Sequence, residues 1–275
     1  GSEMCIRDRA KRVLAVFDEH PHRVTTTVGA EQEFFLIPKE EYERREDLVL
    51  TGRTLFGHSP CKGQELEEHY FGSIRPTVNN FLKALDDKLW ELGIPVRTKH
   101  NEVAPAQHEI APIFSNANQA IDQNLLTMEE MTMLASRFGL VCLLHEKPFE
   151  GVNGSGKHNN WAISADEKNL LDPGETPSDN LRFLVFLTAI IEAVDEYQEL
   201  LRMSVATAGN DHRLGANEAP PAIISIFLGD ELGAIVEAII EGKEYIGHGE
   251  TKIDLGVQSL PLFAKDNTDR NRTSP

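Results

Sequence analysis

Residues 100–112 read HNEVAPAQHEIAP and place two carboxylates, Glu102 and Glu109, among small apolar residues and two prolines. Proteins seldom bury acids without partners, so acids in an apolar strand–turn–strand segment indicate a shared cation. Period-two alternation allows both acids to point into one cavity, with the turn at residues 105–107. The alternative is a solvated hairpin with ordinary surface acids, and this stretch alone leaves both interpretations open.

Upstream, residues 24–37 are rich in β-branched and aromatic side chains and predict a strand. Alternation puts Glu31, Glu33 and Phe35 on one of its faces. Two acids separated by roughly 7 Å suit two neighbouring metal ions, each taking one carboxylate. A charged surface edge strand is the competing interpretation.

The remaining pattern is one of long helices and punctuated loops. Helical spacing of apolar residues predicts helices over residues 10–20, 77–92, 115–138 and 179–203, with Ser115 capping the third and a further helix over 235–241. A short buried strand is expected at 140–144. Residues 38–64 are polar and weakly periodic, which indicates a long excursion or a lid, and residues 242–256 indicate a second polar excursion.

Two loops bear candidate site residues. Asn153 and Gly154 begin an Asn-Gly-Ser-Gly turn whose glycines let a ligand approach the backbone, and His158 follows directly. A lone histidine is more often a satisfied hydrogen-bonding residue than a ligand. Farther on, a glycine- and proline-punctuated loop contains Arg213 and Glu218, together with an aspartate and a histidine at 211 and 212. The arginine is suited to clamp a carboxylate, or else forms a structural ion pair.

Composition excludes several classes of protein. The chain has 275 residues and a formal net charge of -17, from 44 acids and 27 basic residues, so it has no basic stripe to replace phosphate counterions and we expect no nucleic-acid partner. Three cysteines without C-x-x-C spacing fit a reducing, cytoplasmic setting. The apolar runs are too short to cross a bilayer, and no membrane association is expected. Residues 1–9, GSEMCIRDR, lack periodicity and are interpreted as a cloning or assembly scar.

Four acids and one histidine form an oxygen-rich ligand set, which favours magnesium or manganese over zinc. Four carboxylates in one pocket would repel one another unless about two divalent ions neutralise them. Hard cations of this kind usually act on phosphates, and an arginine would stabilise the charge that develops during transfer. Phosphoryl transfer is therefore the favoured chemistry.

Five motifs, in this order, resemble those of glutamine synthetase, and specifically its long-chain type III class. The likeness runs from about residue 24 to the last residue and rests on GAEQEFFLI, KHNEVAPAQHEIAP, VNGSGKHNNW, AGNDHRLGANEAP and DRNRTSP. The resemblance implies an α+β fold with a curved, mainly antiparallel sheet flanked by long helices. It also implies a ring-shaped homo-oligomer that ligates ammonia to the γ-carboxylate of glutamate, through a γ-glutamyl phosphate made from ATP.

The resemblance also implies roles for single residues. Glu33, Glu102 and Glu109 match ligands of the metal that faces glutamate, and Glu31 and His158 match ligands of the metal that faces the nucleotide. The family uses two or three magnesium or manganese ions per site.

Substrate contacts follow in the same way. Asn153 and Gly154 match the loop whose backbone meets the glutamate amino group, and Arg213 matches the residue that holds the α-carboxylate. Glu218 resembles the loop acid that shields the intermediate and helps to deprotonate ammonium.

Three further residues belong to the chemistry that the resemblance implies. Glu102 and Tyr70 are expected near the ammonium, and Arg272 matches an arginine that stabilises the transferred phosphoryl group. Asn160 departs from the better-known bacterial type, in which a second histidine is common. The Glu102-to-Glu109 interval and the 213–218 loop are also one residue shorter, as in type III.

Residues 10–275 match only part of the family's catalytic domain, without its amino-terminal domain and its last part, so we expect this chain alone to have little or no activity. A γ-glutamylpolyamine synthetase and a non-catalytic assembly or regulatory protein are alternatives. A zinc hydrolase is disfavoured because H-E-x-x-H and a thiolate cluster are lacking.

Overall fold

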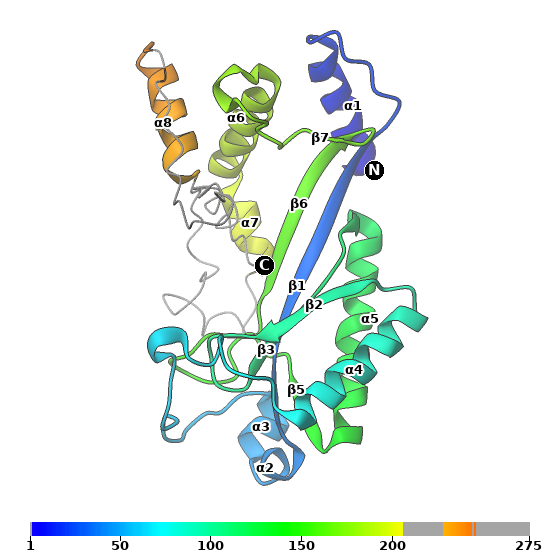
Figure 1. Ribbon diagram of the computed structural model, residues 1–275, viewed down its shortest axis with the longest axis vertical. Helices are drawn as coiled ribbons and strands as arrows, with labels where there is room; N and C mark the ends of the chain where they lie inside the picture. The colour runs from blue at the N-terminus through cyan, green and yellow to red at the C-terminus, as the bar shows by residue number, and fades with distance from the viewer. Residues whose placement is uncertain (1, 206–227, 244, 246–275) are drawn as a thin grey trace, which may run out of the picture. The chain divides into compact units, whose positions relative to one another are not determined.

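The computed structural model describes residues 2–205, 228–243 and 245 (Figure 1). These residues divide into two compact units. The first unit holds the described residues up to 25, from 162 to 198 and from 228 onward. The second unit holds residues 26–161 and 199–205.

A mainly antiparallel sheet, most of whose residues belong to the second unit, is built around one long strand, β1 (Val24–Pro38). Its order is β2 (Val96–Asn101), β3 (Gln107–Pro112), β1 and β6 (Lys157–Ala165). The short strands β4 (Ser115–Asn116) and β5 (Leu140–Leu143) also pair with β1, near its start and its end. The β1–β3 register sets Glu33 opposite Glu109, and the β2–β3 register sets His100 opposite Glu109.

Strand β1 is apolar on both faces because each face is covered. Phe34 and Phe35 are both fully buried, although alternation turns them in opposite directions. Phe34 packs with the apolar side chains of two helices, whereas Phe35 packs with Leu48, Ala104 and Leu143. Glu33 shares the face of Phe35 and is therefore held in a mostly buried layer.

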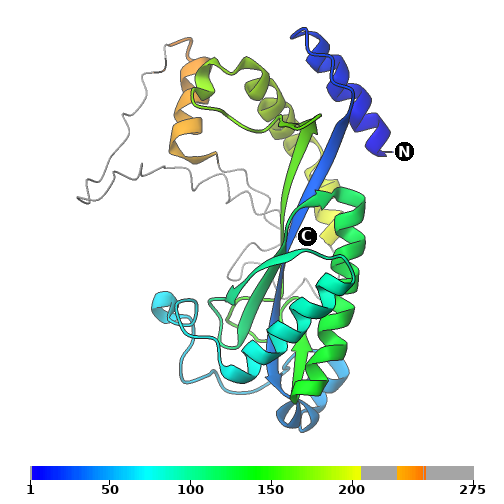
Figure 2. The same cartoon turned by 45° about the vertical axis from the view of Figure 1, so that its right-hand side comes forward.

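The two helices on the Phe34 side are α4 (Pro76–Glu91) and α5 (Ala117–Ala135), which lie side by side (Figures 1 and 2). Five apolar residues of α4 recur at helical spacing and are buried, and each stabilises the fold by roughly 1.5–3 kcal/mol. Asn116, not the predicted Ser115, caps α5, because its side chain accepts from the Asn118 amide at 3.1 Å. A short 3-10 helix, η2 (Ser136–Phe138), ends at Gly139 in the left-handed region.

The predicted excursion after β1 contains short helices, α2 (Lys39–Glu43), α3 (Glu46–Thr51) and η1 (Glu65–Glu67). Asp47 organises its first part. The carboxylate accepts from Arg45 Nε at 2.9 Å and Nη2 at 2.5 Å, and from the Leu48 and Leu55 amides. The sequence prediction missed these helices because their few apolar residues give little periodicity.

The first unit contains α1 (Ser2–Ala15), β7 (Lys168–Asn169), η3 (Pro177–Asp179), α6 (Leu181–Glu196) and α8 (Gly229–Ile240). Helix α1 begins earlier and ends earlier than predicted, so part of residues 1–9 is helical. The single helix expected over 179–203 is interrupted at Tyr197, after which α7 (Gln198–Val205) begins. Strand β7 pairs with the end of β6.

The expected fold class, α+β with a mainly antiparallel sheet flanked by long helices, is confirmed. Among the described helices, none has the length and apolarity that a membrane crossing requires.

Candidate active site

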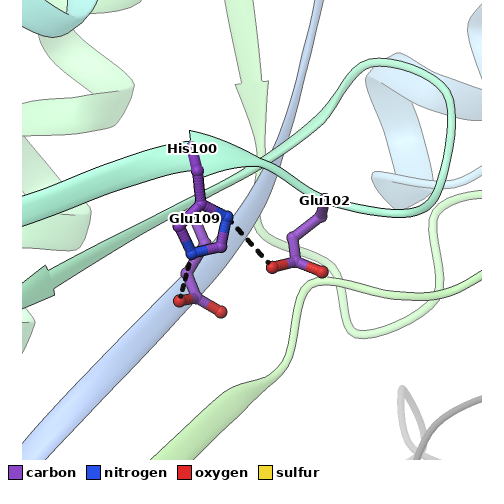
Figure 3. A group of neighbouring side chains, drawn as sticks. All are labelled: His100, Glu102 and Glu109. Atoms are coloured by element: carbon purple, nitrogen blue, oxygen red, sulfur yellow. Dashed lines mark ion pairs between the residues drawn. The ribbon is translucent and has the colours of Figure 1, made fainter. Parts of the chain in front are cut away.

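The β2–β3 hairpin brings Glu102 and Glu109 together around a histidine (Figure 3). His100 Nδ1 lies 3.4 Å from Glu102 Oε1, and His100 Nε2 lies 3.2 Å from Glu109 Oε1. Only 6% of Glu102 and 8% of Glu109 is exposed to solvent, so the interpretation as a solvated hairpin is wrong. One ligand atom from each of the three residues lies within 4.8 Å of the others, which is close enough for one cation to bind them all.

The two acids make His100 a base stronger than usual. Its hydrogen bond to Glu109 is the main cause that raises the pKa of His100 to about 9, with a further contribution from the Glu102 charge and an opposing one from burial. A protonated imidazole offsets part of the charge of the two carboxylates, whereas a metal ion bound by all three residues would require the neutral form of His100. Sequence reasoning missed His100, although it precedes Glu102 by two residues in a strand.

Tyr70 lies beside this cluster, with its ring centroid 5.4 Å from that of His100. Burial raises the pKa of Tyr70, and the charges of Glu102, Glu109 and Glu31 raise it further. Tyr70, which was expected with Glu102 near the ammonium, thus lies beside His100 and within the influence of these acids.

Glu33 lies opposite Glu109 in the sheet, so the two side chains share one face. The Gly156 amide donates to Glu33 Oε2 at 3.1 Å, and the Glu33 amide donates to the Gly156 oxygen at the same distance. Glu33 is 8% exposed.

Glu31, two residues earlier on the same strand, is held by two side chains of β6. His158 Nδ1 lies 2.7 Å from Glu31 Oε2, and Asn160 Nδ2 donates to Glu31 Oε1 at 2.7 Å. The structure therefore brings the expected pair of Glu31 and His158 together. Asn160, noted in the sequence only as a departure, is the second partner of the same carboxylate.

The loop at residues 153–156 is buried and tightly held. Asn153 is 2% exposed and forms two reciprocal bonds with Gln64, from Asn153 N to Gln64 Oε1 at 2.6 Å and from Gln64 Nε2 to Asn153 Oδ1 at 3.0 Å. A Cβ at Gly154 would lie 1.9 Å from the main-chain oxygen of Glu146. A glycine is thus required here by the protein's own backbone, whereas the sequence interpretation attributed it to the approach of a ligand.

Three predicted residues, Arg213, Glu218 and Arg272, lie outside the described residues, as do the aspartate and the histidine at 211 and 212.

The side chains that are described fit a hard divalent cation. The predicted ligands are four carboxylates and one imidazole; Glu33 and Glu109 are buried on neighbouring strands, and Glu102 is buried directly after β2. Oxygen-rich sets of this kind bind magnesium and manganese. Because burial of several acids is unfavourable without positive charge, cations at this position would also stabilise the fold.

Comparison with known proteins gives one family. The model of the glutamine synthetase catalytic domain matches residues 3–220. A glutamine synthetase of Butyrivibrio fibrisolvens is 60% identical over 258 residues, 94% of this chain and 37% of the relative. A type-3 glutamine synthetase of Dictyostelium discoideum is 55% identical over 95% of the chain and 36% of its own length. A glutamine synthetase of Bacteroides fragilis is 51% identical over 97% and 37%, respectively. The chain thus spans just over a third of the length of these relatives.

Proposed function

Because the chain belongs to the glutamine synthetase family, by its match to the catalytic-domain model over residues 3–220, we propose that it forms part of an active site that makes glutamine. ATP would transfer its γ-phosphoryl group to the γ-carboxylate of glutamate. Ammonia would then attack the carbonyl carbon of the γ-glutamyl phosphate and displace phosphate, leaving glutamine, ADP and phosphate.

The observation that supports this proposal most is the burial of Glu33, Glu102 and Glu109 on one part of the sheet. We assign these carboxylates to one magnesium or manganese site, and Glu31 and His158 to a second. Two or three such ions would supply positive charge that neutralises the phosphates and the developing charge on the transferred group.

The chain's own residues would bind and orient glutamate. An amino group donates hydrogen bonds, so in the 153–156 loop it needs carbonyl oxygens. The main-chain N–H of Asn153 already donates to Gln64. The main-chain carbonyl oxygen of Asn153 is therefore the suitable contact for the amino group. The Gly154 oxygen accepts one bond from Gln107 and has a second lone pair for the substrate. Arg213 is proposed to hold the α-carboxylate.

Proton handling and charge stabilisation complete the proposal. Glu102 and Tyr70 would help to bind the ammonium cation, since buried carboxylates attract a cation, and the Glu218 carboxylate would accept the proton that ammonium loses. Arg272 would stabilise the phosphoryl group during transfer. We further propose a cytoplasmic ring of identical subunits, with glutamate, ammonia and ATP as its substrates.

The test measures turnover with ammonium and with putrescine in a longer protein that carries this chain. The chain alone is the second sample. We expect glutamine and ADP to form from ATP, glutamate and ammonium in the longer protein, and little or no turnover by the chain alone. Turnover with putrescine but not with ammonium would refute the proposal and favour a γ-glutamylpolyamine synthetase. A longer protein that binds no nucleotide in the presence of manganese would favour a non-catalytic role.

A further inference from the structure

Gln107, the first residue of β3, is almost completely buried at 1% exposure and bonds in several directions at once. Its Nε2 donates to the Gly154 oxygen at 2.8 Å and lies 3.5 Å from Glu33 Oε2. Its Oε1 accepts from the Ala104 amide at 3.0 Å. Its main-chain oxygen accepts from the Glu102 amide at 2.9 Å. One residue therefore contacts the hairpin turn, the 153–156 loop and two acids of the candidate site.

The loop is joined to Glu33 a second time, two residues farther along. The Gly156 amide donates to Glu33 Oε2 at 3.1 Å, and Gln32 Nε2 donates to the Gly156 oxygen at 3.3 Å and to the Glu33 oxygen at 2.8 Å. A displacement of the loop at Gly154 would thus be transmitted to the carboxylate of Glu33 through several buried polar contacts.

We propose that Gln107 is a positioning residue that holds the Glu33 carboxylate and the 153–156 loop in one arrangement, so that metal binding and glutamate binding depend on the same buried amide. This inference rests on the proposed function, because it takes Glu33 as a metal ligand and the loop as the glutamate contact.

A neutral amide is the side chain that this position requires. The Ala104 amide needs an acceptor, whereas the Gly154 oxygen and the Glu33 carboxylate need a donor. A glutamate at position 107 keeps the shape but turns an oxygen toward two other oxygens, and a leucine leaves the Gly154 oxygen without this donor. A cationic side chain would compete with the metal ion for Glu33.

Gln64 offers a matched control. It holds the same loop through its two bonds to Asn153, the first loop residue, whereas the Glu33 carboxylate accepts from Gly156, the last. Replacing Gln64 therefore loosens the loop at Asn153 and leaves the bonds of Gln107 to Gly154 and Ala104 in place.

The experiment combines two measurements on the 275-residue chain and on Gln107→Glu, Gln107→Leu and Gln64→Leu. Amide hydrogen exchange is followed by NMR without metal, and Mn²⁺ affinity is measured by electron paramagnetic resonance of the free ion. We expect both Gln107 variants to exchange the Gly156 amide about tenfold faster or more and to weaken Mn²⁺ binding about tenfold or more. Gln64→Leu should speed exchange at Asn153 and leave the Mn²⁺ affinity close to that of the wild type. If Gln107→Leu does not fold, the isosteric variant Gln107→Glu still shows whether Gln107 positions the loop and Glu33.

Wild-type exchange at Gly156 in the Gln107 variants would overturn the inference, as would an equal loss of Mn²⁺ affinity in Gln64→Leu. A wild-type chain that binds no Mn²⁺ would instead count against the proposed metal site. In that case exchange at Gly156 still decides whether Gln107 holds the loop to Glu33.

Discussion

Replacing Gly154 with alanine should open the loop that bears the proposed glutamate contacts. The added Cβ would lie 1.9 Å from the Glu146 oxygen and 3.1 Å from its carbon, whereas ordinary contact begins near 3.4 Å. Either the loop at Gly154 or the chain at Glu146 must therefore move by about 1.5 Å. Overpacking of this kind costs about 1–3 kcal/mol. That movement also strains the 3.1 Å bond from the Ser155 amide to Glu146 and the 2.8 Å bond from Gln107 to Gly154, at about 1 kcal/mol each. The free energy of local opening should therefore fall by about 3–5 kcal/mol.

Amide hydrogen exchange measures this change directly, and the Ser155 amide of Gly154→Ala should exchange at least about a hundredfold faster than in the wild type. Gly151→Ala is the matched control in the same loop region. Gly151 has a φ of +80° and no heavy atom within 4 Å of an added Cβ, so alanine there brings only left-handed backbone strain of about 1–2 kcal/mol. If Gly154→Ala exchanges Ser155 no faster than Gly151→Ala does, the close approach to Glu146 does not constrain the loop.

Two further substitutions test separate parts of the second unit. Asn160→Ala should weaken Mn²⁺ binding by about tenfold, because it removes the side-chain amide that orients Glu31 and leaves His158 as the partner seen on β6. An unchanged affinity in a Mn²⁺ titration would show that Asn160 is dispensable for metal binding. Asp47→Asn should lower the free energy of unfolding, since the hydrogen bond from Arg45 holds the pKa of Asp47 well below its usual range. This contribution is complete above the unfolded pKa of 3.8 and is lost as the pH falls toward the lower folded value, so urea unfolding of the two proteins should converge in acid. A difference that does not depend on pH would contradict the ion pair.

The wealth of β-branched and aromatic residues was sufficient to predict β1 from the sequence, and period-two alternation placed Glu31 and Glu33 on a common face. It also identified the two acids of the hairpin. Helix ends were less predictable: α6 stops at Tyr197, where no proline or glycine marks the break.

Side chains that act across the sheet could not be found in the same way. His100 contacts Glu109 because β2 and β3 pair in a particular register. Gln107 bonds to Gly154, which lies 47 positions away in the chain. Gln64 is 89 positions from Asn153. Such contacts depend on the tertiary arrangement and leave no local pattern in the sequence, whereas the acids were conspicuous because they interrupt apolar strands.

The central claim is that the acids and His158 of this chain form a metal site that binds a nucleotide. Calorimetric titration of ADP into the chain, with and without Mn²⁺, tests it most directly, alongside a double variant with Glu102→Ala and His158→Ala. The account predicts ADP binding that requires Mn²⁺ and is lost in the double variant. Binding that is equal in both proteins, or that is absent from both, would contradict an assembled metal–nucleotide site on this chain.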